Sequence, residues 1–176
     1  MPHFLDNYKQ LLARVDALCS TISSALEGQI TCSAGCSSCC TSITVFPVEA
    51  AAIRETLANL PDQEAEEIRR HVSEHADDER CPLLFNHRCL LYEARPIICR
   101  THGLPIIYTN DGRRSSDCCP LNLTNTEALP GSRVIDLDKL NTLLVAVNSI
   151  YLSQSDDAES PERLTIAGVI TSRQAI

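Results

Sequence analysis

The chain has 176 residues, of which 15 are basic and 23 are acidic, so its formal net charge is −8 at pH 7. A protein this acidic is poorly suited to the phosphate backbone of nucleic acids, and we expect no nucleic-acid partner. The length predicts a single domain, residues 1–176. Aromatic residues make up only 4% of the chain, so the core should consist of aliphatic side chains and should gain from staples such as metal ions.

The sequence gives no sign of export or of membrane insertion. Residues 1–6 contain neither a basic region nor a long apolar run, so no secretory signal is predicted. The most apolar stretch, residues 140–152, is interrupted by polar residues and is too short to span a bilayer. We therefore expect a cytoplasmic protein without a membrane partner. In that reducing compartment dense cysteines bind metal more often than they form disulfides, although a disulfide scaffold stays open for an exported form.

Apolar residues recur with a helical period from residue 4 to residue 26, where Gly28 ends the pattern, and this predicts an amphipathic helix over residues 3–28. Cys19 lies on its apolar side and is expected to be a small core residue. Residues 29–42 are small, polar and rich in cysteine. They predict a metal-binding loop in which Gly35 lets the backbone turn around a ligand.

Two helices are predicted next, after a short strand at residues 44–46. Pro47 starts the first, which runs to about residue 59, with Glu49 in the first turn, where the helix dipole favours a carboxylate. Pro61 starts the second, which is strongly charged, faces solvent and runs to about residue 79.

The pattern then changes to short β-like runs, separated by turns that carry cysteines. The runs are residues 83–85, 90–92 and 104–109. A helical turn is predicted at residues 96–101, and the sequence Asn110-Asp111-Gly112 marks a tight turn.

Asp136 is the predicted N-cap of a third substantial helix over about residues 137–153. Its apolar side is formed by Leu137, Leu140, Leu143, Leu144, Val147 and Tyr151. A polar linker, residues 153–160, and a short final helix that starts at Pro161 complete the chain. Together these elements predict an α+β fold that is mostly helical. An irregular cysteine-rich metal-binding centre with short β-strands, about residues 32–120, is flanked by N- and C-terminal amphipathic helices.

Nine of the ten cysteines lie between residues 32 and 119, which is too dense for ordinary core residues. Zinc and iron–sulfur clusters take four thiolates, usually from a close pair and distant partners, and Cys36 and Cys39 are such a pair. The predicted metal ligands are Cys32, Cys36, Cys39, Cys40, Cys81, Cys89, Cys99, Cys118 and Cys119. Cys36, Cys39, Cys40 and Cys99 are also the candidates for binding a cofactor, either zinc or an iron–sulfur cluster.

Two pairs of cysteines are adjacent in the sequence, Cys39-Cys40 and Cys118-Cys119. In extended backbone, neighbouring side chains point to opposite sides, so the two members of a pair could serve different centres. Nine thiols could supply two four-ligand sites with one left over; one site plus several core thiols is the alternative.

Histidines offer weaker candidates. His71 and His75 have the spacing of two zinc ligands on one helix face, but their charged neighbours favour a solvated face. His102 follows Cys99 by three residues and is more typical of a polar turn than of a ligand.

Three stretches resemble a known family: the sequence Gly35-Cys36-Ser37-Ser38-Cys39-Cys40, the sequence Pro47-Val48-Glu49-Ala50, and residues 89–100, with the sequence CLLYEARPIICR. They are similar to the CxxCxxCC, or YkgJ-like, cysteine cluster family of zinc- or iron-chelating domains. The resemblance covers about residues 32–120. One spacing departs from the pattern, because three residues separate Cys32 from Cys36 where the family's name implies two.

The resemblance implies a bacterial, cytoplasmic metal-binding protein. Our first hypothesis is that its cysteines hold zinc or an iron–sulfur cluster and thereby fix the fold. A related cluster in flagellin lysine methylases implies an alternative, an iron–sulfur-dependent redox or protein-modifying enzyme. Metal storage or delivery is a further alternative. Whether the protein is an enzyme, and which protein partner it has, are left open. The motif residues are Tyr92, Glu93, Arg95 and Arg100. The two arginines could offset thiolate charge or hydrogen-bond groups that orient the ligands, and the alternative for Arg95 is a structural ion pair with Glu93.

Overall fold

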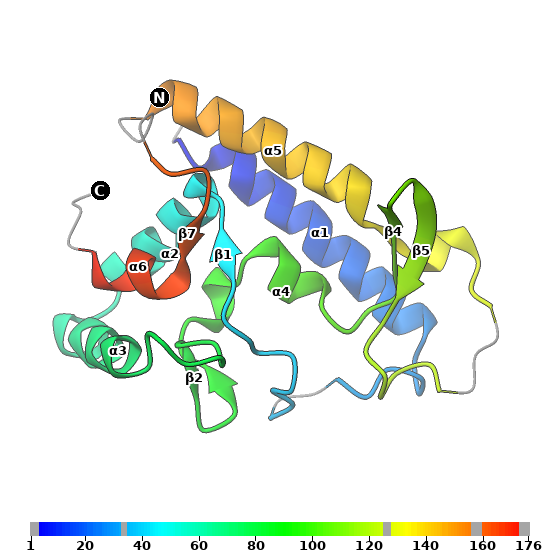
Figure 1. Cartoon of the computed structure of the whole chain (residues 1–176), viewed down its shortest axis with the longest axis horizontal. Helices are drawn as coiled ribbons and strands as arrows, with labels where there is room; N and C mark the ends of the chain where they lie inside the picture. The colour runs from blue at the N-terminus through cyan, green and yellow to red at the C-terminus, as the bar shows by residue number, and fades with distance from the viewer. Residues whose placement is uncertain (1–3, 33–34, 125–127, 156–159, 173–176) are drawn as a thin grey trace.

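The computed structural model describes residues 4–32, 35–124, 128–155 and 160–172. Two long helices, α1 (Asp6–Ala25) and α5 (Leu137–Gln154), lie side by side, and three shorter ones, α2 (Pro47–Ala58), α3 (Asp62–Glu74) and α6 (Ile166–Thr171), lie at one end of the molecule (Figure 1). Short strands and irregular segments fill the space between them. This arrangement confirms the mostly helical α+β fold. None of the described helices is both long enough and apolar enough to cross a membrane.

The two long helices are the predicted flanking helices. In α1, Tyr8, Val15 and Ile22 are buried, but Leu18 is exposed, and so is Phe4, which precedes the helix. The buried stripe is therefore narrower than the apolar pattern predicts. At the start of α5, the Asp136 carboxylate accepts a hydrogen bond of 3.2 Å from the backbone N–H of Lys139, which confirms the N-cap. Leu143 is also exposed rather than part of the buried side of α5.

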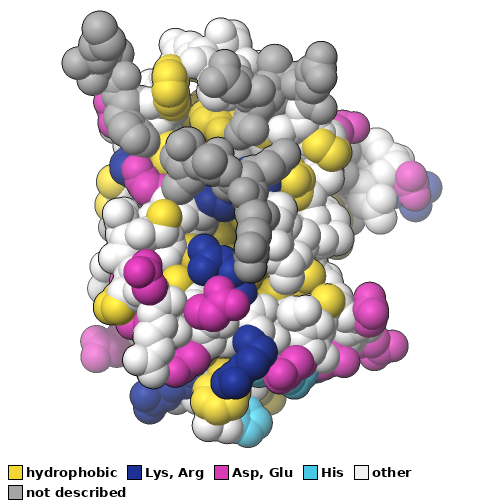
Figure 2. Space-filling view, turned by 90° about the vertical axis from the view of Figure 1, so that its left-hand side faces the viewer, with side chains coloured by type: hydrophobic (Ala, Val, Ile, Leu, Met, Phe, Trp, Pro, Cys, Tyr) yellow, Lys and Arg dark blue, Asp and Glu magenta, His cyan; other side chains and the backbone are white. Residues whose placement is uncertain are grey.

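The shorter helices form a second cluster of buried apolar residues. Ala65, Ile68 and Val72 bury one side of α3, so this helix is not wholly solvent-facing, and it ends before the predicted residue 79. On the face of the molecule shown in Figure 2, carboxylates are scattered over the lower half, where α3 lies. The Lys and Arg side chains on this face do not form a continuous basic patch.

The final helix begins later than predicted. Pro161 does not start it; residues Leu164–Thr165 instead form β7, which pairs antiparallel with β1 (Thr44–Val45). Helix α6 starts after this strand, and the Thr165 hydroxyl accepts a 3.1 Å hydrogen bond from the N–H of Gly168. Part of the predicted polar linker, residues 156–159, lies outside the described residues.

The cysteine-rich centre contains a tight hairpin of β2 (Leu84–Phe85) and β3 (Arg88–Cys89). Its two turn residues, Asn86 and His87, both have positive φ, as a two-residue hairpin turn requires. The prediction of a strand at residues 90–92 is wrong, because pairing ends at Cys89 and a 3-10 helix, η1 (Tyr92–Ala94), follows. The predicted helical turn is confirmed as α4 (Ile97–Thr101).

A second hairpin projects from the body of the molecule (Figure 1). It joins β4 (Ile106–Asn110) to β5 (Arg113–Asp117) through the predicted turn at Asp111 and Gly112. Strand β4 also pairs in parallel with β6 (Ile135–Asp136), which follows the 3-10 helix η2 (Gly131–Arg133). Strand β5 has no apolar residue, so it carried no pattern that could predict it.

Candidate metal centre

Four cysteines from four separate segments come together near α4. Burial, together with the charges of Cys81, Cys89 and Cys40, raises the pKa of the Cys99 thiol to about 12. Burial also raises the pKa of Cys89 to about 11, and the charges of Cys81 and Cys40 add to this effect. All four side chains are half-buried. We call Cys40, Cys81, Cys89 and Cys99 the inner thiol group.

Backbone pairing brings three of these thiols together. The N–H of Cys81 donates to the carbonyl of Cys40 at 3.1 Å, beside an isolated β-bridge between Thr41 and Arg80. Cys89 lies opposite Leu84 in the β2–β3 hairpin, and the N–H of Leu84 donates to the carbonyl of Cys81 at 2.9 Å. The hairpin and the bridge therefore fix the positions of Cys40, Cys81 and Cys89 relative to one another.

Two backbone N–H groups point at the sulfur atoms of this group. The N–H of Leu83 donates to the Cys81 thiol, and the N–H of Leu91 donates to the Cys89 thiol; each bond opposes the effect of burial by lowering the pKa of its thiol. In both cases the donor lies two residues after the cysteine. Such bonds stabilise the thiolate and orient it, as outer hydrogen bonds do around bound metals.

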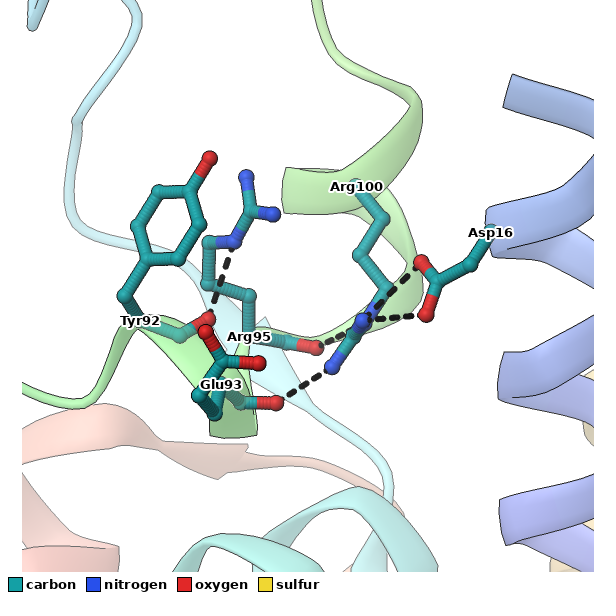
Figure 3. Close-up of polar contacts among 5 residues, drawn as sticks. All are labelled: Asp16, Tyr92, Glu93, Arg95 and Arg100. Atoms are coloured by element: carbon teal, nitrogen blue, oxygen red, sulfur yellow. Dashed lines mark hydrogen bonds and ion pairs between the residues drawn. The ribbon is translucent and has the colours of Figure 1, made fainter. Parts of the chain in front are cut away.

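Arg100 holds α4, the helix that carries Cys99 (Figure 3). Its guanidinium forms an ion pair with Asp16 of α1, with N–O distances of 2.9 and 2.7 Å. It also donates to the carbonyl of Arg95 at 2.8 Å and to the carbonyl of Glu93. Arg100 therefore joins α4, η1 and α1, and its role is to position Cys99.

Arg95 offsets thiolate charge rather than pairing with Glu93. Its guanidinium lies 3.6 Å from the centre of the Tyr92 ring, and its Nε donates to the Tyr92 carbonyl at 3.0 Å (Figure 3). The positive charge lowers the pKa of Cys89 and of Cys99, against the larger effect of burial. Within the described residues, no ion pair joins Arg95 to Glu93.

Glu49 connects the start of α2 to the start of α4. Its side chain is 4% exposed. One carboxylate oxygen accepts the N–H of Phe46 at 3.0 Å, and the other accepts the N–H of Ile97 at 3.1 Å. Burial raises the pKa of this carboxyl group, and the two hydrogen bonds oppose the shift. The sequence placed Glu49 in the first turn of α2 but could not predict its contact with Ile97.

The other five cysteines between residues 32 and 119 lie along a second, more exposed area. Burial raises the pKa of Cys32, and the charges of Cys119, Cys36 and Cys39 contribute in the same direction. Burial, then the charges of Asp117 and Cys119, raises the pKa of Cys118. Unlike the inner thiols, Cys32, Cys36 and Cys39 are exposed. We call Cys32, Cys36, Cys39, Cys118 and Cys119 the outer thiol group.

The two groups meet at Cys39 and Cys40. A turn, in which the N–H of Cys40 donates to the carbonyl of Ser37 at 3.0 Å, brings these thiols within hydrogen-bonding distance of each other. The expectation that the two side chains point to opposite sides of extended backbone is therefore wrong. The other charges that act on the two thiols still differ. Cys81 has the strongest electrostatic effect on Cys40, whereas Cys39 is affected by Cys36 in addition to Cys40.

The Asn122 side chain forms a hydrogen bond to Cys32, and no feature of the sequence predicted this contact. Its side chain is 3% exposed. Its amide nitrogen donates to the Cys32 sulfur at 3.3 Å and to the carbonyl of Gly103 at 2.7 Å, and its oxygen accepts the N–H of Thr31 at 2.8 Å. A buried amide with partners on two other segments holds the start of the cysteine loop against the turn that follows α4.

The remaining candidates take other roles. Cys19 is half-buried on α1 and packs against the core, as predicted. The rings of His71 and His75 lie 4.3 Å apart, and their nitrogens contact the carbonyls of Leu84 and His71, respectively. They are half-buried beside the β2–β3 hairpin rather than on a solvated face. His102 is an exposed residue at the end of α4.

The donors of the inner thiol group fit a zinc ion or an iron–sulfur cluster, because both take four sulfur ligands with hydrogen bonds to the sulfurs. As the side chains stand, no three His, Cys, Asp or Glu residues in the described part of the chain lie where they could hold one ion. Binding would therefore draw the thiols closer together.

No curated protein and no solved structure matches the chain. One family model matches residues 31–120, just over half of the chain, and it spans both thiol groups, Glu49 and the segment from η1 to α4. The chain therefore belongs to the CxxCxxCC family, whose domain is described as "putative zinc- or iron-chelating".

Proposed function

We propose that the protein binds a zinc ion or an iron–sulfur cluster through Cys40, Cys81, Cys89 and Cys99, and that this centre fixes the fold between α1 and the helices α2, α3 and α6. The observation that carries the proposal is the meeting of four thiols from four segments, two of which receive backbone N–H bonds at sulfur. The family description supports metal chelation in general.

A centre at this position would supply folding free energy. The segments that carry the four thiols contain only two-residue strands and one-turn helices. Such elements are not stable by themselves in water. Metal binding requires deprotonated thiols, so the affinity depends on pH, and the free energy of binding becomes free energy of folding.

All ten cysteines are unpaired. This supports a place of action where thiols stay reduced, and we propose the cytoplasm.

Purification without oxygen, followed by visible spectroscopy and assay of iron, sulfide and zinc, tests the proposal. We expect either brown protein with matched iron and sulfide or colourless protein with zinc, and we expect the Cys89→Ser variant to lose one centre. Cys19→Ser removes another half-buried thiol and is the matched control, which should keep the full metal content. A metal-free wild type, or a Cys89→Ser variant with unchanged content, would overturn the proposal.

A cavity bears on the alternative of an iron–sulfur enzyme. It has a volume of about 740 Å³ and lies against α4, where Ile97, Ile98 and Thr101 line it, but no described cysteine does. A substrate in this cavity would not meet a thiol of the inner group. We therefore propose a structural role for the inner centre ahead of a redox or protein-modifying activity.

A further inference from the structure

We propose that Cys32, Cys36, Cys39 and Cys119 form a second metal site, separate from the inner thiol group, which binds a thiophilic divalent ion such as zinc and exchanges it with solvent. The proposal extends the proposed function, and rests on it only for the identity of the first site. It assigns two roles to the thiols: the inner group retains its metal, and the outer group can receive or release one.

The outer site is built around Cys32. Asn122, which is 3% exposed, donates to the Cys32 sulfur at 3.3 Å, and its remaining hydrogen bonds go to Gly103 and Thr31. A buried amide that donates a hydrogen bond to a sulfur atom holds that sulfur in a defined position.

Gly103 leaves the space that this sulfur occupies. Its φ is +90°, and a Cβ atom added there would lie 2.6 Å from the Cys32 sulfur and 3.8 Å from the Cβ of Cys119. Residues 32 and 119, which are far apart in the sequence, therefore meet at one backbone position. The absence of a side chain at residue 103 allows this approach.

The two sites differ in exposure. Three of the four outer ligands, Cys32, Cys36 and Cys39, are exposed, and only Cys119 is half-buried, whereas every thiol of the inner group is half-buried. A chelator or a receiving thiol can therefore reach an ion in the outer site without unfolding the chain. Release from the inner site requires the hairpin, the β-bridge or α4 to open. Sulfur ligands select soft ions and zinc, so the outer site should prefer these to calcium or magnesium.

The surroundings of the thiols differ as well. The Arg80 and Arg95 guanidinium groups lie close enough to the inner thiols to favour their thiolate forms. Around Cys32 and Cys39, the charges that act on the thiols come from other cysteines. A divalent ion would offset this negative charge directly.

The test uses the full chain, loaded anaerobically with zinc, in the wild type and in the Gly103→Ala variant. We expect native mass spectrometry to find two zinc ions per wild-type chain and a colorimetric chelator, pyridylazoresorcinol, to remove one of them at least tenfold faster than the other. Gly103→Ala should bind only the slowly released ion. Gly112→Ala is the matched control, since it changes a glycine with a φ of +73° that has nothing within 4 Å of the added Cβ, and it should keep both ions.

Two further variants keep the outcomes distinguishable. Cys32→Ser should also lose the fast ion and adds no steric clash, so it serves if Gly103→Ala fails to fold. Cys89→Ser should lose the slow ion. A wild type with one zinc ion, or a fast ion that survives both Gly103→Ala and Cys32→Ser, would overturn the second site. If Cys89→Ser keeps the slow ion, the proposed inner centre fails while the outer site stands.

Discussion

Removing the metal from the inner thiol group should unfold the centre of the chain and lower the melting temperature by tens of degrees. Structural zinc sites contribute apparent binding free energies of about 10–16 kcal/mol at neutral pH. A domain has a total stability of only about 5–15 kcal/mol, so the loss of the centre removes much of what holds the fold. The β2–β3 hairpin, η1 and α4 should open first, because their strands and helices are only two to five residues long.

Hydrogen exchange of the protein before and after anaerobic chelation measures this effect. The amides of Leu84, Leu90 and Cys99, which are hydrogen-bonded in the folded chain, should exchange much faster after chelation. Amides inside α5 serve as the internal reference and should change least, because this helix packs on α1 and α2 away from the inner thiols. Equal exchange around the thiols in both states would show that metal does not hold this region.

Glu49→Ala should destabilise the protein by about 4 kcal/mol, since it leaves the N–H groups of Phe46 and Ile97 without their acceptor, and each unsatisfied buried group costs about 1–3 kcal/mol. Such a loss lowers the melting temperature of a chain of this size by about 8–16 °C. The variant should also bind metal more weakly, because the N–H of Ile97 begins the helix that carries Cys99.

Glu55→Ala is the matched control for Glu49→Ala. Glu55 lies in the same helix, and its carboxylate pairs with Lys9 at 2.7 Å on a partly exposed surface. Exposed ion pairs contribute about 0.2–1 kcal/mol, so this variant should melt close to the wild type. Chemical denaturation of both metal-loaded variants measures the difference. If Glu49→Ala lowers the free energy of unfolding by no more than Glu55→Ala does, then Glu49 does not join α2 to α4 through these two hydrogen bonds.

The sequence predicted the helices well where local signals were strong. Asp136 marked the start of α5, because an N-cap is a local contact: the carboxylate accepts a hydrogen bond from the backbone N–H three residues later. Pro47 marked the start of α2 for a similar reason. Pro161 misled the prediction of the final helix, because Leu164 and Thr165 pair with β1, a segment more than a hundred residues earlier.

The cysteine pattern predicted a metal centre but could not sort its ligands. Sorting depends on long-range contacts, such as the bond between Cys81 and Cys40, and on the turn that brings Cys39 against Cys40. Asn122 follows the last cysteine as an ordinary polar residue, and only the folded chain shows its contact with Cys32. The resemblance to the family was carried by the cysteine loop and by two further stretches that contain Glu49 and Arg100, and the structure gives both of these residues a positioning role.

The most direct test of the inner centre is X-ray absorption at the metal edge in a variant in which all five outer thiols, Cys32, Cys36, Cys39, Cys118 and Cys119, are replaced by serine. We predict that this variant still binds metal and that each ion has four sulfur neighbours at about 2.3 Å, the distance of zinc or iron to sulfur. A variant without metal, or an ion with fewer than four sulfur neighbours, would contradict the assignment of Cys40, Cys81, Cys89 and Cys99 as one complete ligand set.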